Sequence, residues 1–185
     1  MQDHEIIALF CARSEQAILA LADKYGGICT RVARNILNDP RDAEECVNDA
    51  YLGAWNTIPP QRPDPLRTYV CRIVRNLAIR RYHANTAQKR GGAYDVALDE
   101  LEACLTAGDT PEGQLTAREL SRVLDCFLDT LDRTDRALFV RRYWYAESIG
   151  QLAQWAGWSN NRVSVRLARV RKRLRLYLKK EGYLL

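Results

Sequence analysis

The sequence predicts an all-α fold of two small helical bundles joined by a flexible linker, with a helix-turn-helix in the second bundle. Three observations support this prediction. Apolar residues recur at helical spacing along most of the chain, and no segment alternates convincingly as a β-strand would. The 185 residues are enough for two small domains. A weakly patterned stretch with several glycines separates the two halves.

The first domain is expected to span residues 1–83. It opens with a short amphipathic stretch over residues 3–13, and Ser14 can cap the helix that follows. The adjacent Gly26 and Gly27 are expected to break this helix, because glycine is unfavourable in a helix interior. Helical patterning then resumes and is expected to stop at the Asn-Asp-Pro sequence that precedes Arg41.

The next helix is expected to begin at Asp42, because acids in a first turn suit the positive end of the helix dipole. It has an apolar face, and Glu45 and Asp49 lie on another side. Residues 56–65 contain four of the six prolines and are expected to form a loop. A basic helix is then predicted over residues 66–90.

Patterning weakens over residues 84–114, which are expected to form the linker with at most a brief helix at 96–105. The second domain is expected to span residues 115–185 and to be helical throughout.

The distribution of charge is more informative than the net charge of +5. Residues 61–90 carry eight basic side chains against one acid, and residues 91–135 carry eleven acids against three bases. From residue 162 to the end the net charge is +8. Two basic blocks on either side of an acidic one favour two contact points on a single polyanion.

The sequence SIGQLAQWAGWSNNRVSVRL has the pattern of a helix-turn-helix. Ser148 and Gln151 fit a capping box at a helix start. Gly157 can adopt the positive φ that a tight turn demands, and Ser159 can cap the next helix. Val163 is placed to pack back on the first helix, and these offsets together indicate the motif.

The second helix of the motif carries an apolar stripe beside a basic one. Nine positive side chains and no acid occur between Arg162 and Lys180. Such a helix repels itself in solvent, whereas against DNA the same charges release counterions. The alternative is an interaction helix with a solvated cationic face, or an RNA-binding helix. The apolar stripe consists of Val163, Leu167, Val170, Leu174 and Leu178.

Residues at the start of this helix can reach base edges, and those further along are better placed to hold phosphates. The first set, together with its capping residue, consists of Ser159, Asn160, Asn161, Arg162, Ser164, Val165 and Arg166. The second set consists of Arg169, Arg171, Lys172 and Arg173.

Two ordered segments of the chain resemble a known family. The first domain contains the sequence NILNDPRDAEECVNDAYLGAW, then a loop, then LRTYVCRIVRNLAIRRY. In this order they resemble the promoter-melting domain of bacterial RNA polymerase sigma factors. The compact extracytoplasmic-function (ECF) group of the sigma-70 family is the best match. The second domain resembles the helix-turn-helix domain with which that group recognises the upstream minus-thirty-five element. The resemblance covers residues 14–82 and 116–181.

The resemblance implies a role for each part of the first domain. In the family, the helix after the Asn-Asp-Pro sequence docks on RNA polymerase core enzyme, and the following loop and helix capture the unpaired non-template strand of the minus-ten element. The implied polymerase-binding residues are Asp42, Glu45, Asn48 and Asp49. The implied minus-ten DNA-binding residues are Arg67, Tyr69, Arg72, Arg75, Asn76 and Arg80. An acidic face beside an apolar one also suits a protein partner with basic residues.

The sequence departs from the family at some of these positions. Leu66 and Tyr69 stand where Phe and Trp are usual, which alters the surface available for base stacking. The recognition helix usually begins with Gly-Thr and Lys, where this chain has Asn161, Arg162 and Ser164. These changes leave the class of function intact and alter the promoter sequence that is expected to be read.

The sequence does not indicate an enzyme. It has no nucleophile–base pair, metal-ligand cluster or phosphate-cradling glycine loop, so no catalytic residue, cofactor or metal is expected. The six cysteines are too widely spaced for a zinc site and are expected to be mostly small, reduced core residues. Without an 18-residue apolar run or a basic n-region, a cytoplasmic protein with no membrane span is expected.

The predicted function is that of a sigma factor that brings RNA polymerase core to selected promoters and assists their opening. One alternative is a stand-alone helix-turn-helix transcriptional regulator, and another is a scaffold whose basic helices bind an acidic protein or RNA. Membership of the ECF group also implies an anti-sigma factor as a candidate inhibitor. The acidic linker is expected either to cross near the polymerase active-site channel or to keep the basic domains from unproductive DNA binding.

Overall fold

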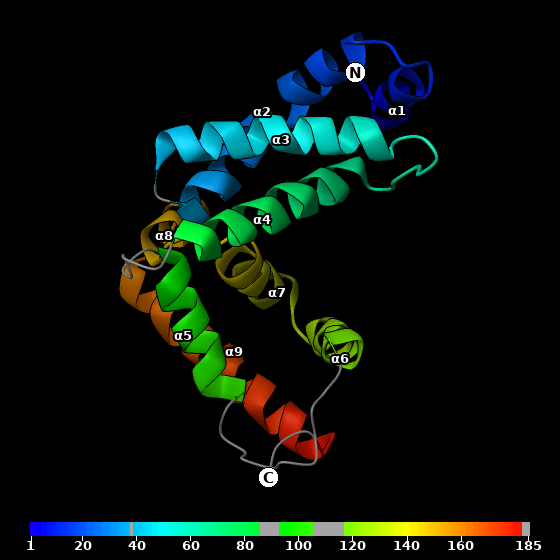
Figure 1. Ribbon diagram of the computed structural model, residues 1–185. Coiled ribbons are helices and arrows are strands. Elements are labelled where there is room, and N and C mark those ends of the chain that lie inside the picture. Colours follow the sequence, from blue (N-terminus) through cyan, green and yellow to red (C-terminus); the bar gives the residue numbers. More distant parts are fainter. Residues whose placement is uncertain (38, 86–92, 106–116, 183–185) are drawn as a thin grey trace. The chain divides into compact units, whose positions relative to one another are not determined.

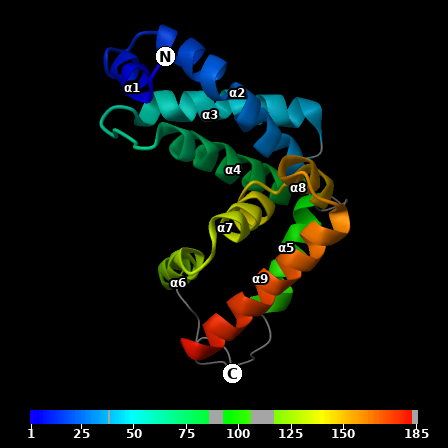
Figure 2. The ribbon, with the colours of Figure 1, turned by 180° about the vertical axis from the view of Figure 1, so that it is seen from behind.

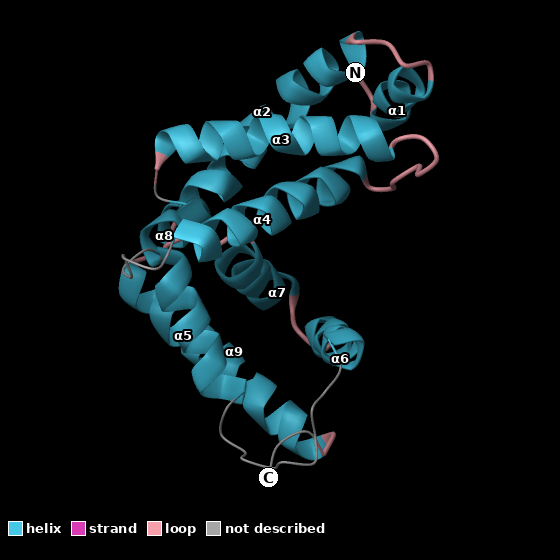
Figure 3. Ribbon diagram, viewed as in Figure 1, coloured by secondary structure: helices cyan, strands magenta, loops and turns pink. Residues whose placement is uncertain are grey.

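The structure is a computed structural model that describes residues 1–37, 39–85, 93–105 and 117–182 (Figure 1). All regular structure in these residues is helical, which confirms the predicted all-α class (Figure 3). None of the described helices is both long and apolar enough to cross a membrane.

Two compact units make up the chain, Met1–Gly92 and Ala93–Leu185. The elements are α1 (Asp3–Cys11), α2 (Gln16–Leu37), α3 (Pro40–Thr57), α4 (Leu66–Asn85), α5 (Ala93–Leu105), α6 (Ala117–Asp129), α7 (Arg133–Phe139), the π-helical turn η1 (Val140–Trp144), α8 (Ile149–Ala156) and α9 (Asn160–Lys180).

In the first unit, α2, α3 and α4 pack against one another and α1 packs on α2 (Figure 2). Each helix buries one stripe, and small side chains on α3 let its neighbours approach closely. Most of the apolar face predicted for α3 is buried, and Tyr51 is half-buried. The buried residues of α3 are Ala43, Cys46, Val47, Ala50 and Ala54, and those of α4 are Leu66, Val70, Cys71, Val74 and Ala78.

The predicted helix break at Gly26 and Gly27 is wrong, because α2 runs through both residues. A Cβ atom at position 26 would lie 3.1 Å from the hydroxyl oxygen of Tyr51, so the missing side chain makes room for α3. Gly53 makes room in the same way for α4, since its Cβ would lie 3.3 Å from Cγ2 of Ile73. Close packing of helices thus offsets the cost of glycine in a helix interior.

Helix α3 begins at Pro40, two residues before the predicted start. The side chain of Asp39 accepts hydrogen bonds from the backbone N–H groups of Arg41 (2.8 Å) and Asp42 (3.1 Å). Proline suits the first helical position, where its missing N–H costs nothing. The backbone hydrogen bonds from Asp42 and Arg41 lower the pKa of the Asp39 carboxyl group.

Three cysteines lie in the core of the first unit as predicted, namely Cys29, Cys46 and Cys71. Burial raises the pKa of Cys46 to about 11, and a hydrogen bond with Cys71 together with burial raises the pKa of Cys29. Cys126 of α6 is exposed, contrary to the expectation of a core residue. In the described part of the chain, no group of three or more His, Cys, Asp or Glu side chains could hold a metal ion.

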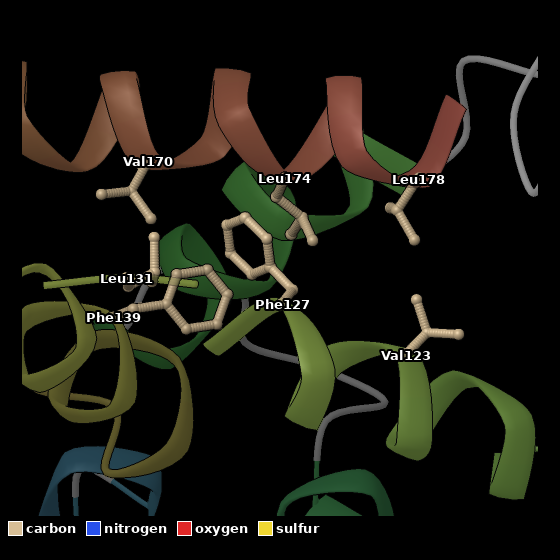
Figure 4. Packing of buried hydrophobic residues seen from close by; sticks show 7 residues of the cluster. All are labelled: Val123, Phe127, Leu131, Phe139, Val170, Leu174 and Leu178. Atoms are coloured by element: carbon tan, nitrogen blue, oxygen red, sulfur yellow. The ribbon is translucent and has the colours of Figure 1, made fainter. Parts of the chain in front are cut away.

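In the second unit, the predicted apolar stripe of α9 is buried along its whole length. Its first half packs on α7 and α8 in a cluster of Leu138, Leu152, Ala153, Val163 and Leu167. Its second half packs around Phe127 of α6 (Figure 4). That second cluster comprises Val123, Phe127, Leu131, Phe139, Val170, Leu174 and Leu178. One helix therefore joins α6, α7 and α8 into a single unit.

Helix α5 occupies the middle of the segment predicted as a linker and packs along α9 and η1 (Figures 1 and 2). Its Glu100 meets Arg142, whose side chain is only 2% exposed, with 3.1 Å between Arg142 Nη2 and Glu100 Oε1. Tyr143 donates its hydroxyl hydrogen bond to Glu100 (3.0 Å), and Arg171 of α9 donates to Glu100 (3.0 Å). Glu100, which lies in the segment expected to be a linker, is thus a partner for a buried guanidinium.

We expect Glu100→Gln to destabilise the second unit by about 2 kcal/mol, because it replaces the carboxylate that pairs with the buried Arg142 by a neutral amide. The loss is smaller than for a fully buried pair, since Glu100 is itself partly exposed. Asp99→Asn is the matched control, because Asp99 is the exposed neighbour on the same helix. Urea unfolding followed by tryptophan fluorescence measures both, and equal stability of the two variants would contradict the assignment.

Candidate nucleic-acid interface

Helix α4 presents a row of polar and cationic side chains to solvent. Arg67, Arg72, Asn76 and Arg80 are exposed, whereas Arg75 is half-buried. These are the residues predicted for the minus-ten element, and they lie along one helix as the sequence indicated. The described surface of α4 therefore offers cations spaced along about four turns of helix.

Tyr69 is held in place by its neighbours on both sides. Its hydroxyl donates a hydrogen bond to Oγ1 of Thr57 (2.8 Å), and Thr57 in turn donates to the carbonyl of Gly53 (2.7 Å). The guanidinium carbon of Arg72 lies 5.4 Å from the centre of the Tyr69 ring. A hollow of about 210 Å³ lies beside them, lined by Pro63, Asp64, Pro65, Thr68, Tyr69 and Arg72.

The acidic residues of α3 do not form one uniform surface. Arg81 of α4 binds Glu45 at 2.7 Å and donates to the backbone carbonyl of Asp42 at 3.0 Å. The side-chain amide of Asn85 donates to the carboxylate of Asp42 (3.0 Å). Asp42 and Glu45 are therefore tied to the end of α4, whereas Asn48 and Asp49 are exposed one turn further along α3.

The helix-turn-helix geometry follows the sequence prediction closely. Ser148 and Gln151 form the capping box of α8, with a 2.7 Å hydrogen bond from the Ser148 backbone N–H to the Gln151 side chain. Gly157 ends α8 with φ +67°. The Ser159 hydroxyl caps α9 by accepting a hydrogen bond from the backbone N–H of Arg162 (3.3 Å).

The start of α9 is open to solvent. Its exposed residues are Ser159, Asn160, Asn161, Arg162, Ser164 and Val165, and the exposed cations further along include Arg169, Lys172 and Arg173. The guanidinium carbon of Arg162 stacks 4.1 Å from the ring centre of Trp158, in the turn of the motif. The predicted base-reading set thus lies together at one end of the helix, with the exception of Arg166.

Arg166 is held by acids of α7 and its cap. Its Nε donates to the carboxylate of Asp135, which is only 4% exposed, and its Nη2 lies 3.0 Å from Asp132. The hydrogen bond to Asp135 raises the pKa of Arg166. The side chain, which is predicted to reach base edges, lies in an ion-pair cluster with these acids and remains 38% exposed.

Two residues predicted to hold phosphates are also engaged within the protein. Arg171 binds Glu100 and the Tyr143 hydroxyl, with 2.9 Å between Arg171 Nη1 and the tyrosine oxygen. Arg173 is exposed but donates to the backbone carbonyl of Thr130 (3.2 Å) and lies 3.6 Å from Asp135. The cationic surface of α9 is therefore narrower than the sequence suggested.

Comparison with known proteins finds similarity to sigma factors. The model of sigma-70 region 2 matches residues 21–88, which include α3 and α4. SigL of Mycobacterium tuberculosis, an ECF RNA polymerase sigma factor, is 27% identical over 184 residues, covering 92% of this chain and 94% of SigL. The RNA polymerase sigma factor NccH of Alcaligenes xylosoxydans xylosoxydans is 27% identical over 175 residues, covering 92% and 91%. The chain therefore has a match to sigma-70 region 2 and is similar to ECF sigma factors over 92% of its length.

These similarities give the class of function. They support the function of a sigma factor, which binds RNA polymerase and directs it to promoters. Sigma factors are in general initiation factors rather than enzymes. A solved structure of CnrH in complex with the cytosolic domain of CnrY also matches, with 22% sequence identity and a TM-score of 0.45. The match covers 96% of this chain and 97% of the matched chain.

The polar contacts that hold the helices of the second unit together could not be predicted from the sequence. Glu147 is buried and binds Nε of Arg141 at 2.8 Å, and Arg142 is buried in contact with Glu100. The only sequence signal was a pair of arginines inside the apolar run LFVRRYW. Their partners lie up to 42 residues away, so spacing along the chain could not identify them.

We expect Gly157→Ala to destabilise the second unit by about 1 kcal/mol, because a Cβ is strained at positive φ. Gly150→Ala is the control, since its new Cβ would approach nothing closer than 3.9 Å and alanine favours a helix. Three of the four tryptophans lie in this unit, so their fluorescence during thermal unfolding reports it. A Gly157→Ala variant as stable as Gly150→Ala would show that the turn does not need this backbone conformation.

Proposed function

We propose that this sigma factor holds a promoter at two places and polymerase at a third. The polymerase and minus-ten contacts belong to the first domain (residues 1–83), and the minus-thirty-five contacts belong to the helix-turn-helix domain (residues 115–185). The segment over 84–114 connects them, with α5 attached to the second unit rather than loose. The single observation that carries the proposal is the pairing of a region 2 match with a separate helix-turn-helix whose recognition helix starts open to solvent.

The first promoter contact is the unpaired non-template strand at the minus-ten element, bound along α4. Arg67, Arg72 and Arg80 are exposed and can track phosphates, and Asn76 offers an amide that donates and accepts. The half-buried Tyr69 ring borders the 210 Å³ hollow, where an unpaired base could lie against it. Melting then needs no catalytic group, because bound unpaired bases offset the cost of unstacking.

The polymerase contact is the exposed part of α3, at Asn48 and Asp49. Asp42 and Glu45 contribute less directly, because Arg81 and Asn85 already occupy their carboxylates. An acidic surface beside an apolar core suits a partner with basic residues, which would be supplied by the core enzyme.

The second promoter contact is duplex DNA at the minus-thirty-five element, with the start of α9 in the major groove. Five residues are exposed there, namely Asn160, Asn161, Arg162, Ser164 and Val165, and Arg162 stacks on Trp158. Arg169 and Lys172 are placed to bind phosphates. We assign Arg166 and Arg171 to holding the helix in position instead.

We assign the catalysis of RNA synthesis to polymerase and no catalytic step to this chain. We place the chain in the cytoplasm. CnrH has been seen with the cytosolic domain of CnrY, and regulation by an anti-sigma factor is the corresponding proposal for this chain. A stand-alone regulator is not favoured, because such a protein has no need of the region 2 helices.

The direct test is transcription in vitro with purified core enzyme and the full chain, followed by mapping of start sites. Promoter-dependent transcripts that require the added chain support the proposal. Tight binding to promoter duplex without any affinity for core enzyme would replace it with the stand-alone regulator.

We expect Asp49→Lys to weaken binding to core enzyme by at least about tenfold, because like charges at a protein interface cost one or more kcal/mol. Asp23→Lys is the matched control, as Asp23 is an exposed acid on α2 outside the proposed contact. Co-purification with core enzyme and fluorescence titration measure the difference. Equal affinities for the two variants would remove α3 from the interface.

We expect Arg169→Gln to lower the salt dependence of promoter binding by the holoenzyme, reducing the slope of log K against log salt by about one. Arg171→Gln should leave that slope nearly unchanged, because Arg171 is paired with Glu100. Filter binding over a range of salt concentrations measures both slopes. The assignment of Arg171 is wrong if its variant lowers the slope as much as Arg169→Gln.

A further inference from the structure

The arginines of α9 have two kinds of partner, and the difference has a consequence for DNA binding. Arg166 and Arg171 are paired with carboxylates, which offset their charge and engage some of their N–H donors. Arg162 instead lies over an aromatic ring, with 4.1 Å between its guanidinium carbon and the ring centre of Trp158. A ring face orients the guanidinium plane, but it leaves the charge and the N–H groups at the edge available.

Trp158 is well placed to be a fixed platform. It immediately precedes Ser159, the cap of α9, and it packs against the cluster that contains Val163 and Leu152. The backbone N–H of Arg162 is bound by the Ser159 hydroxyl at 3.3 Å. Both ends of residue 162 are thus fixed, its backbone by the cap and its side chain by the indole.

Stability of the helix gives no reason for an arginine at this place. A cation in the first turn of a helix is disfavoured by the positive end of the helix dipole. The described residues include a comparable stack, Arg141 on Trp155 at 4.5 Å, but Arg141 is also paired with Glu147. Arg162 therefore combines an oriented guanidinium with an open charge at the exposed start of the recognition helix.

We propose that Trp158 is a positioning residue for base recognition at the upstream promoter element, and that it presents Arg162 to a guanine in the major groove. This inference rests on the proposed function, in which the start of α9 enters that groove. Guanine is the base whose O6 and N7 accept the two parallel hydrogen bonds that a guanidinium edge donates. Ordering the side chain in advance lowers the entropy that binding would otherwise cost.

The test is selection from a promoter library in which the minus-thirty-five segment is randomised, using holoenzyme assembled from the full chain and core enzyme. The wild type is expected to select guanine at one position that Arg162→Gln no longer distinguishes, with a loss of about tenfold in preference. Trp158→Leu should lose about threefold to tenfold at that same position only. Trp158→Phe keeps a ring and should retain most of the preference.

The double variant Trp158→Leu/Arg162→Gln separates positioning from a structural role. It should select as Arg162→Gln alone does, because the ring acts through the arginine. Trp155→Leu is the control, since it removes an exposed ring from the other stack and should leave the selected sequence unchanged. If Trp158→Leu weakens every position equally, or adds its full loss in the double variant, Trp158 has only a structural role and the inference is overturned.

The outcomes distinguish this inference from the proposed function. Arg162→Gln without effect on any position overturns both the inference and the assignment of Arg162 to base recognition. An effect of Arg162→Gln with none from Trp158→Leu overturns the inference alone. Should Trp158→Leu fail to fold, proton NMR of the wild-type chain decides: an upfield ring-current shift of the Arg162 Cδ and Nε protons is expected, and its absence overturns the inference.

Discussion

Burial of one stripe of α9 is the interaction on which the second unit depends. Val163 and Leu167 pack on α7 and α8, and the three apolar residues that follow pack around Phe127 of α6. Because helix geometry fixes every other side chain relative to this stripe, burial also decides which cations face α5 and α7 and which face solvent. The proposed DNA-binding surface is therefore a consequence of core packing rather than a separate feature.

Carboxylates then divide the cations of α9 between two tasks. The buried Asp135 pairs with Arg166 and the partly buried Glu100 pairs with Arg171, and these pairs join α7 and α5 to the helix. The exposed Arg162, at the start of the helix, and Arg169 are the cations that we propose meet bases and phosphates. The same division occurs in the first unit, where Arg81 binds Glu45 while Asp49 stays exposed. A count of charges along the sequence overestimates both surfaces for this reason.

Local rules predicted much of this structure. The stripe of α9, the capping box at Ser148 and the positive φ of Gly157 depend on residues within one or two turns, so their spacing was sufficient. The uninterrupted α2 could not be predicted in that way, because Gly26 is explained by Tyr51 on another helix. The ion pair between Arg166 and Asp135 joins residues 31 positions apart, and only the folded chain brings them together. Segment 96–105 was correctly noted as a candidate helix, but its attachment through Glu100 was not predictable.

The central claim is that the open start of α9, and not its later turns, meets promoter DNA. A photoreactive amino acid placed in turn at Val165 and at Leu176, which are 43% and 60% exposed on the same helix, tests this in holoenzyme bound to a promoter. The account predicts crosslinks from position 165 to duplex DNA upstream of the start site, and few from position 176. Crosslinks mainly from position 176, or none from position 165 in an active complex, would contradict it.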